Sequence, residues 1–307
     1  MVSEMSLEKF ADVEYGEEQM VWHLCTPGNW PGVLFKSRED FVYGMNMVAV
    51  AAYNSRYVKI FTFQLMSNHL HFVILGAETD VMEFYSVLKR YMLRLWNNNA
   101  GEAQVRLLVP KLFPVEDRKY LQHLIAYVNR NGYVTDSSCT PFSYKWGANA
   151  LFFNGLRNCV SKVPLNSLTI RDRRSIFRKR DLDLPADWYL TDGYISPECY
   201  CQIDAAESCF NSAHHYFSII SKGVESFVEM AKELGDAIFY TDNELYRVVA
   251  NMCIKEFGCP DAALLAKNQK ISLAVKLRKE YNAGVKQLSR ILKLENHIVE
   301  SLFPKLG

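Results

Sequence analysis

Residues 65–73 read Leu-Met-Ser-Asn-His-Leu-His-Phe-Val, and this stretch carries more information about the fold than any other part of the chain. The segment from His69 to Leu75 is apolar apart from its two histidines, which predicts a buried β-strand. Side chains alternate along a strand, so His69 and His71 are expected on the same face. Two imidazoles on one strand form a pair of candidate metal ligands. The alternative, two ordinary core histidines, requires each ring to find a buried hydrogen-bond partner.

Alternation, helical periodicity and capping residues predict the elements around this strand. A Ser37 cap with Glu39 and Asp40 in the first turn begins one helix, and Asn131-Gly132 is predicted to end another as a left-handed cap. The order β-α-β-β-α-β-α predicts an α+β fold, a ferredoxin-like antiparallel sheet with packed helices, followed by a mostly helical C-terminal region. The expected strands are 20–25, 57–66, 69–75 and 104–113, and the expected helices are 37–54, 79–99 and 117–130.

The run Met66-Ser-Asn-His-Leu-His-Phe72 resembles the HUH motif (His, bulky apolar residue, His) of single-tyrosine transposases, and in particular the REP-associated type. The usual spelling in that family is Met-Pro-Asn-His-x-His, and Ser67 replaces the proline here. The resemblance covers roughly residues 15–150. It implies that residues 1–150 form an HUH transposase or nuclease catalytic domain.

The same resemblance implies a nucleophile on a helix after the histidine strand. Tyr127 matches the family's Tyr-Ile/Val-x-x-Asn-Pro pattern, with Asn131 retained and Gly132 in place of the proline. His123, Tyr127 and Asn131 are four residues apart, so they line one helix face. Asn131 is the candidate third metal ligand, after His69 and His71. With 17 tyrosines in the chain, a core role for Tyr127 is the alternative.

For the chemistry, the resemblance implies metal-dependent cleavage and strand transfer of single-stranded or hairpin DNA, at sites associated with repeats. Tyr127 would attack the phosphorus, form a 5′-phosphotyrosine link and free a 3′-hydroxyl. A divalent ion would polarise the scissile phosphate. Imidazoles with an amide oxygen suit Mn²⁺, Mg²⁺ is tolerated, and two histidines alone leave Zn²⁺ open.

The formal net charge of +1 does not indicate a nucleic-acid partner, so any DNA contacts must come from local basic groups. In the catalytic region the candidates are Lys89, Arg90, Arg94 and Arg130. Residues 151–240 are predicted to be a basic linker and helical region. Residues 241–307 resemble a helix-turn-helix module, and segment 267–293 holds eight Lys or Arg against one acid. Its candidate DNA contacts are Lys276, Lys286 and Arg290, although the expected recognition helix, 295–302, is acidic.

Two features of the sequence bear on its cellular compartment. The N-terminus lacks the apolar core of a signal peptide, and no segment reaches membrane-spanning length. We therefore expect a cytoplasmic protein with reduced cysteines and no membrane partner, and we favour a monomer over a dimer. A zinc site built from Cys199, Cys201, His214 and His215 is a further alternative. Two other functions also remain open: a non-catalytic DNA-binding regulator that recognises hairpin repeats, and a zinc-dependent hydrolase.

Overall fold

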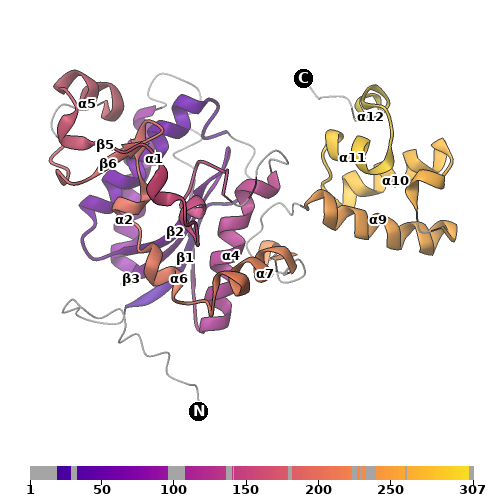
Figure 1. Ribbon diagram of the computed structural model, residues 1–307, viewed down its shortest axis with the longest axis horizontal. Helices are drawn as coiled ribbons and strands as arrows, with labels where there is room; N and C mark the ends of the chain where they lie inside the picture. Colours follow the sequence, from indigo (N-terminus) through magenta and orange to yellow (C-terminus); the bar gives the residue numbers. More distant parts are fainter. Residues whose placement is uncertain are drawn as a thin grey trace, which may run out of the picture. The chain divides into compact units, whose positions relative to one another are not determined.

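The computed structural model describes most of the chain, in two compact units (Figure 1). Unit 1 comprises residues 1–133 and 139–227, and unit 2 comprises residues 134–138 and 228–307. The functional boundaries expected at residues 150 and 240 stay predictions. The described residues are 19–28, 33–95, 108–135, 140, 142–178, 182–222, 227–228, 230–232, 240–259 and 261–303.

Unit 1 is built on a four-stranded antiparallel sheet in the order β2-β3-β1-β4. This is the strand order of a ferredoxin-like fold, so the predicted fold class is confirmed. The histidine strand, β3, lies inside the sheet between β2 and β1. The strands are β1 (Met20–Cys25), β2 (Lys59–Leu65), β3 (Leu70–Gly76) and β4 (Lys111–Pro114).

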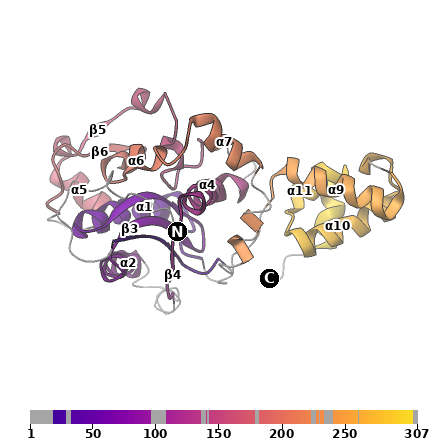
Figure 2. The same cartoon turned by 90° about the horizontal axis from the view of Figure 1, so that it is seen from below.

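Helices α1 (Arg38–Asn54) and α2 (Glu78–Leu95) pack on one face of this sheet (Figure 2). This face is apolar, and it includes the buried, directly paired Phe63 and Phe72. Ser37 caps α1 in a capping box with Asp40, as predicted. Phe72 of β3 meets Phe84 of α2 edge to face, with ring centroids 5.3 Å apart. The predicted end of the second helix at residue 99 lies outside the described residues.

Helix α4 (Arg118–Thr135) packs on the other face of the sheet. The prediction that Asn131-Gly132 ends this helix is wrong, because the helix continues through both residues. Glycine is needed at 132 for space rather than for a left-handed turn. A Cβ atom there would lie 2.2 Å from the ring of Tyr144, whose hydroxyl donates to the Leu65 carbonyl at 2.7 Å.

The remainder of unit 1 contains a small sheet and short helices. Strands β6 and β7 form a hairpin whose turn, Asp192 and Gly193, is exposed and has positive φ, whereas Tyr194 and Ile195 after the turn are buried. The strands are β5 (Val163–Pro164), β6 (Tyr189–Thr191) and β7 (Tyr194–Ile195). The helices are α5 (Ile170–Phe177), α6 (Ile203–Glu207) and α7 (Ala213–Lys222), with 3₁₀ turns η2 (Asn149–Leu151), η3 (Arg157–Cys159), η4 (Leu165–Ser167) and η5 (Pro197–Cys199).

Unit 2 is helical, which confirms the predicted helical C-terminal region. Its helices enclose their own apolar core, which includes Leu245, Leu273, Leu288 and Val299. They are α9 (Asp242–Phe257), α10 (Lys267–Tyr281), α11 (Val285–Leu292) and α12 (Asn296–Leu302), with the 3₁₀ turn η6 (Ala262–Leu264). Across the described ranges of both units, no helix has the length and apolar character needed to cross a membrane.

Candidate metal and nucleophile site

The sheet face beneath α4 carries a row of polar side chains that crosses all four strands. The strand register places Gln64 of β2 opposite His71 of β3, His71 opposite Cys25 of β1, and Cys25 opposite Lys111 of β4. Directly opposed residues in a sheet point to the same face. Gln64, His71 and Cys25 are each at most 1% exposed. This face is therefore both buried and polar, in contrast with the apolar face beneath α1 and α2.

The two histidines of the HUH-like motif lie together on this face. His71 belongs to β3 and His69 directly precedes it, and their ring centroids are 4.8 Å apart with the rings nearly perpendicular. His69 Nδ1 is 2.7 Å from Oδ1 of Asn68, which orients the ring. Both imidazoles are buried. The structure thus brings together the two residues expected to be metal ligands.

The side chain of Tyr127, on α4, also lies next to these two histidines. Its ring stands perpendicular to that of His71, with centroids 5.7 Å apart. On the other side it faces Phe227 at a centroid distance of 6.2 Å, and its own exposure is 4%. Asn131 follows one turn later on α4 and is half-buried, and its role as a third ligand stays a prediction.

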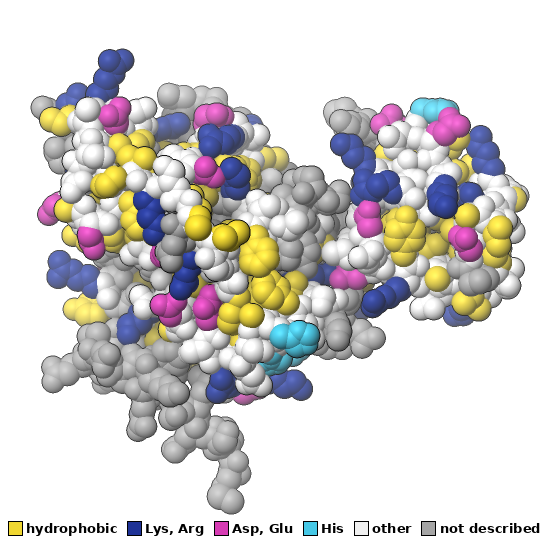
Figure 3. Space-filling model, viewed as in Figure 1, with side chains coloured by type: hydrophobic (Ala, Val, Ile, Leu, Met, Phe, Trp, Pro, Cys, Tyr) yellow, Lys and Arg dark blue, Asp and Glu magenta, His cyan; other side chains and the backbone are white. Residues whose placement is uncertain are grey.

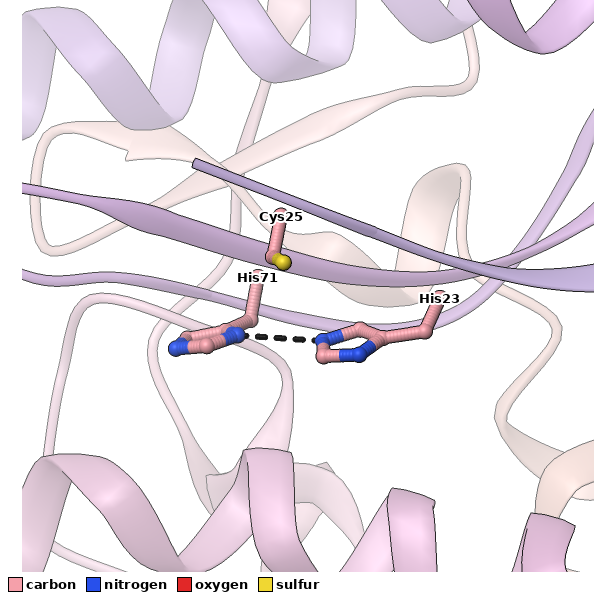
Figure 4. Close-up of side chains that lie close together, drawn as sticks. All are labelled: His23, Cys25 and His71. Carbon is pink, nitrogen blue, oxygen red and sulfur yellow. Dashed lines mark hydrogen bonds between the residues drawn. The ribbon is translucent and has the colours of Figure 1, made fainter. Parts of the chain in front are cut away.

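Sequence reasoning missed two residues of this site, His23 and Cys25, both on β1. His23 Nε2 lies 3.1 Å from His71 Nδ1, and the two rings are stacked at 5.3 Å with an interplanar angle of 12°. The donor atoms of His23, Cys25 and His71 all lie within 4.8 Å of one another. Figure 4 shows the two imidazoles on the same side of their strands, with the Cys25 sulfur near His71. The available signal was His23-Leu-Cys25, a second pair of metal donors at i, i+2.

Burial controls the charge of these imidazoles. Desolvation lowers the pKa of His71 to about 3. Desolvation, followed by repulsion from His71, lowers the pKa of His23 well below its ordinary value. Both rings are therefore neutral at pH 7, the form in which imidazole offers a lone pair to a metal.

The buried group of His23, Cys25 and His71 could hold a metal ion. Its donors are two nitrogens and one sulfur, a set that suits zinc and similar transition ions. It does not suit Mg²⁺, which prefers oxygen ligands. In the described part of the chain no other group of three or more His, Cys, Asp or Glu residues has this proximity, so the alternative zinc site with Cys199 and His214 is not formed.

Buried hydrogen bonds fix α4 above the polar face. Gln64 Nε2 donates to the Asn129 carbonyl at 3.0 Å, and Gln64 Oε1 accepts from the Gly132 amide at 2.6 Å. The Thr62 hydroxyl donates to Asn129 Oδ1, and Asn129 Nδ2 donates to the Tyr216 hydroxyl at 2.9 Å. These contacts hold the helix turn that follows Tyr127.

The predicted DNA-binding residues of unit 1 lie in different environments. Lys89 is half-buried and donates to the Leu108 carbonyl at 2.7 Å, whereas Arg90 and Arg94 are exposed on α2. Arg130 is 4% exposed, with its guanidinium 4.8 Å from the centroid of the Phe227 ring. Arg130 therefore does not present its charge at the surface, and a DNA contact by it would require this packing to open.

In unit 2, two of the predicted DNA-binding residues form ion pairs. Lys276 Nζ lies 2.6 Å from a Glu256 carboxylate oxygen, and Arg290 Nε lies 2.8 Å from one of Asp242. Lys286 is exposed on α11. On the face seen in Figure 3, Lys and Arg side chains of this unit are interspersed with Asp and Glu. The basic character of segment 267–293 is thus partly neutralised by acids from α9.

Comparisons with protein-family models, with curated proteins and with solved structures found no match to this chain.

Proposed function

We propose that this protein is a metal-dependent DNA strand-cleaving and strand-joining enzyme of the single-tyrosine HUH type, in which Tyr127 is the nucleophile. One observation carries the proposal: the ring of Tyr127, on α4, lies 5.7 Å from the ring of His71, which in turn lies 4.8 Å from that of His69. Two imidazoles and a phenol from separate elements converge, as the HUH-like motif predicts.

The proposed reaction is a transesterification at phosphorus. The Tyr127 oxygen, as it loses its proton, forms a bond to the scissile phosphorus, and the bond from phosphorus to the 3′-oxygen breaks. The products are a 5′-phosphotyrosine and a free 3′-hydroxyl, which takes up a proton. Attack by a 3′-hydroxyl on the phosphotyrosine reverses the step and joins the strands without ATP.

A divalent ion, Mg²⁺ or Mn²⁺, is part of this proposal, with His69, His71 and Asn131 as its ligands. When bound, it would neutralise charge on the phosphate. Of the two ions, Mn²⁺ agrees better with imidazole donors. The neutral state of His71 supports a ligand role and argues against His71 as the base that removes the Tyr127 proton, since a pKa of about 3 makes it a weak base.

The substrate of such an enzyme is single-stranded or hairpin DNA, because the nucleophile must approach the backbone of one strand. Tyr127 is 4% exposed, and its ring contacts that of Phe227. The approach of DNA to Tyr127 therefore requires the side chains around it, Phe227 among them, to move.

The test is covalent capture of labelled DNA with Mn²⁺ present. A pool of hairpin oligonucleotides with randomised single-stranded flanks is labelled at either the 5′ or the 3′ end and analysed on denaturing gels. We expect the 3′ label to migrate with the protein and the 5′ label to appear on a shortened free strand. Tyr127→Phe should abolish the adduct. Tyr120→Phe, the same change on the same helix, should retain it. An adduct that survives Tyr127→Phe would remove this residue from the proposed role.

The closed state of the site favours one second candidate, a non-catalytic DNA-binding regulator that recognises hairpin repeats. Tyr127 and Arg130 are both buried, and the short helices α11 and α12 follow one another in unit 2, which is compatible with the proposed helix-turn-helix module. This candidate predicts hairpin binding by the wild-type protein without any covalent adduct, a result that the same experiment distinguishes.

A further inference from the structure

We infer that His23, Cys25 and His71 form a binding site for a soft divalent transition ion of the Zn²⁺ or Co²⁺ class. The inference stands on the geometry of the β1–β3 pair, so it holds whether or not Tyr127 cleaves DNA. It differs from the proposed Mg²⁺ or Mn²⁺ set, because two of its three ligands, His23 and Cys25, are on β1.

The spacing of the donor atoms is close to that of a shared metal ion. At zinc–nitrogen distances of about 2.0–2.1 Å, two tetrahedral ligands are separated by about 3.3 Å. His23 Nε2 and His71 Nδ1 are 3.1 Å apart, and the three donor atoms lie within 4.8 Å of one another. Small side-chain rotations would suffice to bring all three donors to bonding distance of one ion.

The backbone fixes this arrangement. Cys25 pairs directly with His71 across the β1–β3 ladder, and His23 lies two residues before Cys25 on the same face of β1. Both strands are in the interior of the four-stranded sheet, and the three side chains are at most 1% exposed. A site supported by paired strands is rigid, which favours metal affinity because little ordering is required on binding.

The chemistry of the group also agrees with a soft ion. A thiolate excludes Mg²⁺ and selects zinc-like ions, and imidazole suits the same ions. The ring of His23 directs Nε2 toward Nδ1 of His71, and the two nitrogens share one hydrogen bond. A metal ion would take the place of the proton in that bond, and this proton would move to the other nitrogen of its ring.

Charge and proton balance follow from this assignment. The two imidazoles bind in their neutral form, and the Cys25 thiol must lose its proton to bind as thiolate, so uptake of one ion releases one proton. Three protein ligands leave the fourth tetrahedral position for a water molecule or another small ligand. A neutral imidazole has a single lone pair, so an ion on Nδ1 of His71 excludes one on its Nε2. The soft ion and the proposed Mn²⁺ therefore compete for His71.

The experiment is a Co²⁺ titration of the full chain after treatment with chelator and reductant. We expect one Co²⁺ per chain, a thiolate-to-cobalt charge-transfer band, release of one proton, and displacement of the band by Zn²⁺. Cys25→Ser should abolish the band and weaken Zn²⁺ binding by about a hundredfold or more, as expected for the loss of a ligand. Cys253→Ser, the same change at a buried cysteine of unit 2, should leave both unchanged.

Two results would overturn the inference: wild-type protein that takes up no Co²⁺, or a charge-transfer band that persists in folded Cys25→Ser protein. If Cys25→Ser does not fold, cobalt X-ray absorption on the wild type decides, because the site requires one sulfur and two imidazoles around the metal. A spectrum without sulfur rejects it. Tyr127→Phe should bind Co²⁺ like the wild type, so failure of the proposed cleavage activity and failure of this site are separate outcomes.

Discussion

Acidification should destabilise unit 1 through the buried imidazoles of His23 and His71. His23 and His71 have folded-state pKa values below the value of about 6.5 for an exposed histidine, so below that pH the unfolded chain binds more protons than the folded one. Their neutral form stabilises the fold above pH 6.5, and this contribution is lost as the pH falls. A ring that stays neutral in the folded state over this range contributes about 1.4 kcal/mol between pH 7.5 and 5.5, so the two rings contribute about 3 kcal/mol together.

Urea denaturation followed by tryptophan fluorescence, with chelator present, measures this change selectively. All five tryptophans belong to unit 1, and residues 228–307 contain none. We expect the free energy of unfolding of unit 1 to fall by about 3 kcal/mol from pH 7.5 to 5.5. His23→Gln keeps a hydrogen-bonding side chain next to the His71 ring but removes one titrating imidazole. It should therefore halve the pH-dependent loss of stability. His214→Gln, at an exposed position of the same unit, should leave it unchanged.

Two results would contradict this expectation: the same pH dependence in the wild type and in His23→Gln, or a loss of less than about 1 kcal/mol by the wild type over this range. Either result would mean that the imidazoles bind protons in the folded state, with water or a counter-ion reaching the sheet face beneath α4.

Three further outcomes are expected. Gly132→Ala should destabilise unit 1 by about 1–3 kcal/mol in urea, because the added Cβ atom meets the Tyr144 ring at 2.2 Å, whereas Gly155→Ala, with no atom within 4 Å, should be neutral. Asn129→Ala should cost about 2–3 kcal/mol in the same assay, since it removes two buried hydrogen bonds, to the hydroxyls of Thr62 and Tyr216. Lys286→Ala should lower the affinity for hairpin DNA, and the logarithm of the binding constant should fall less steeply with the logarithm of salt concentration, by about 1 in slope, because one phosphate contact is lost. An unchanged slope would mean that Lys286 does not contact DNA.

Local signals were sufficient to predict the fold class. The apolar patterns of residues 20–25 and 69–75, the Ser37 cap and the apolar stripe around Leu124 each act within a few residues, and the four elements begin within one residue of their expected starts. The end of α4 could not be predicted in this way. Gly132 is a helix terminator by propensity, but its role depends on Tyr144, twelve residues away and packed against it.

Only some residues of the candidate site could be predicted, because the others depend on contacts between distant parts of the chain. His69, His71 and Tyr127 belong to a recognisable pattern, and the structure places their rings together. His23 and Cys25 become part of the site only through the β1–β3 register, which joins residues separated by about fifty positions along the chain. A shift of one residue in that pairing would turn both side chains to the α1–α2 face. The donor residues can be read from the sequence, but their proximity depends on the register between β1 and β3.

The position of Tyr127 over His71 depends on residues that take no part in the proposed chemistry. Gln64 is paired with His71 in the β2–β3 ladder, so its location relative to the imidazole is set by the backbone. The same side chain binds α4 at two points, the Asn129 carbonyl and the Gly132 amide, and two contacts fix both the height and the rotation of the helix. Tyr127 is two residues before Asn129, so the direction of its ring follows from that rotation. The amide of Gln64 therefore links the position of the nucleophile candidate to that of the metal-ligand candidates. This role accounts for a polar side chain at a fully buried position of β2, where a strand that faces only a core would carry an apolar one.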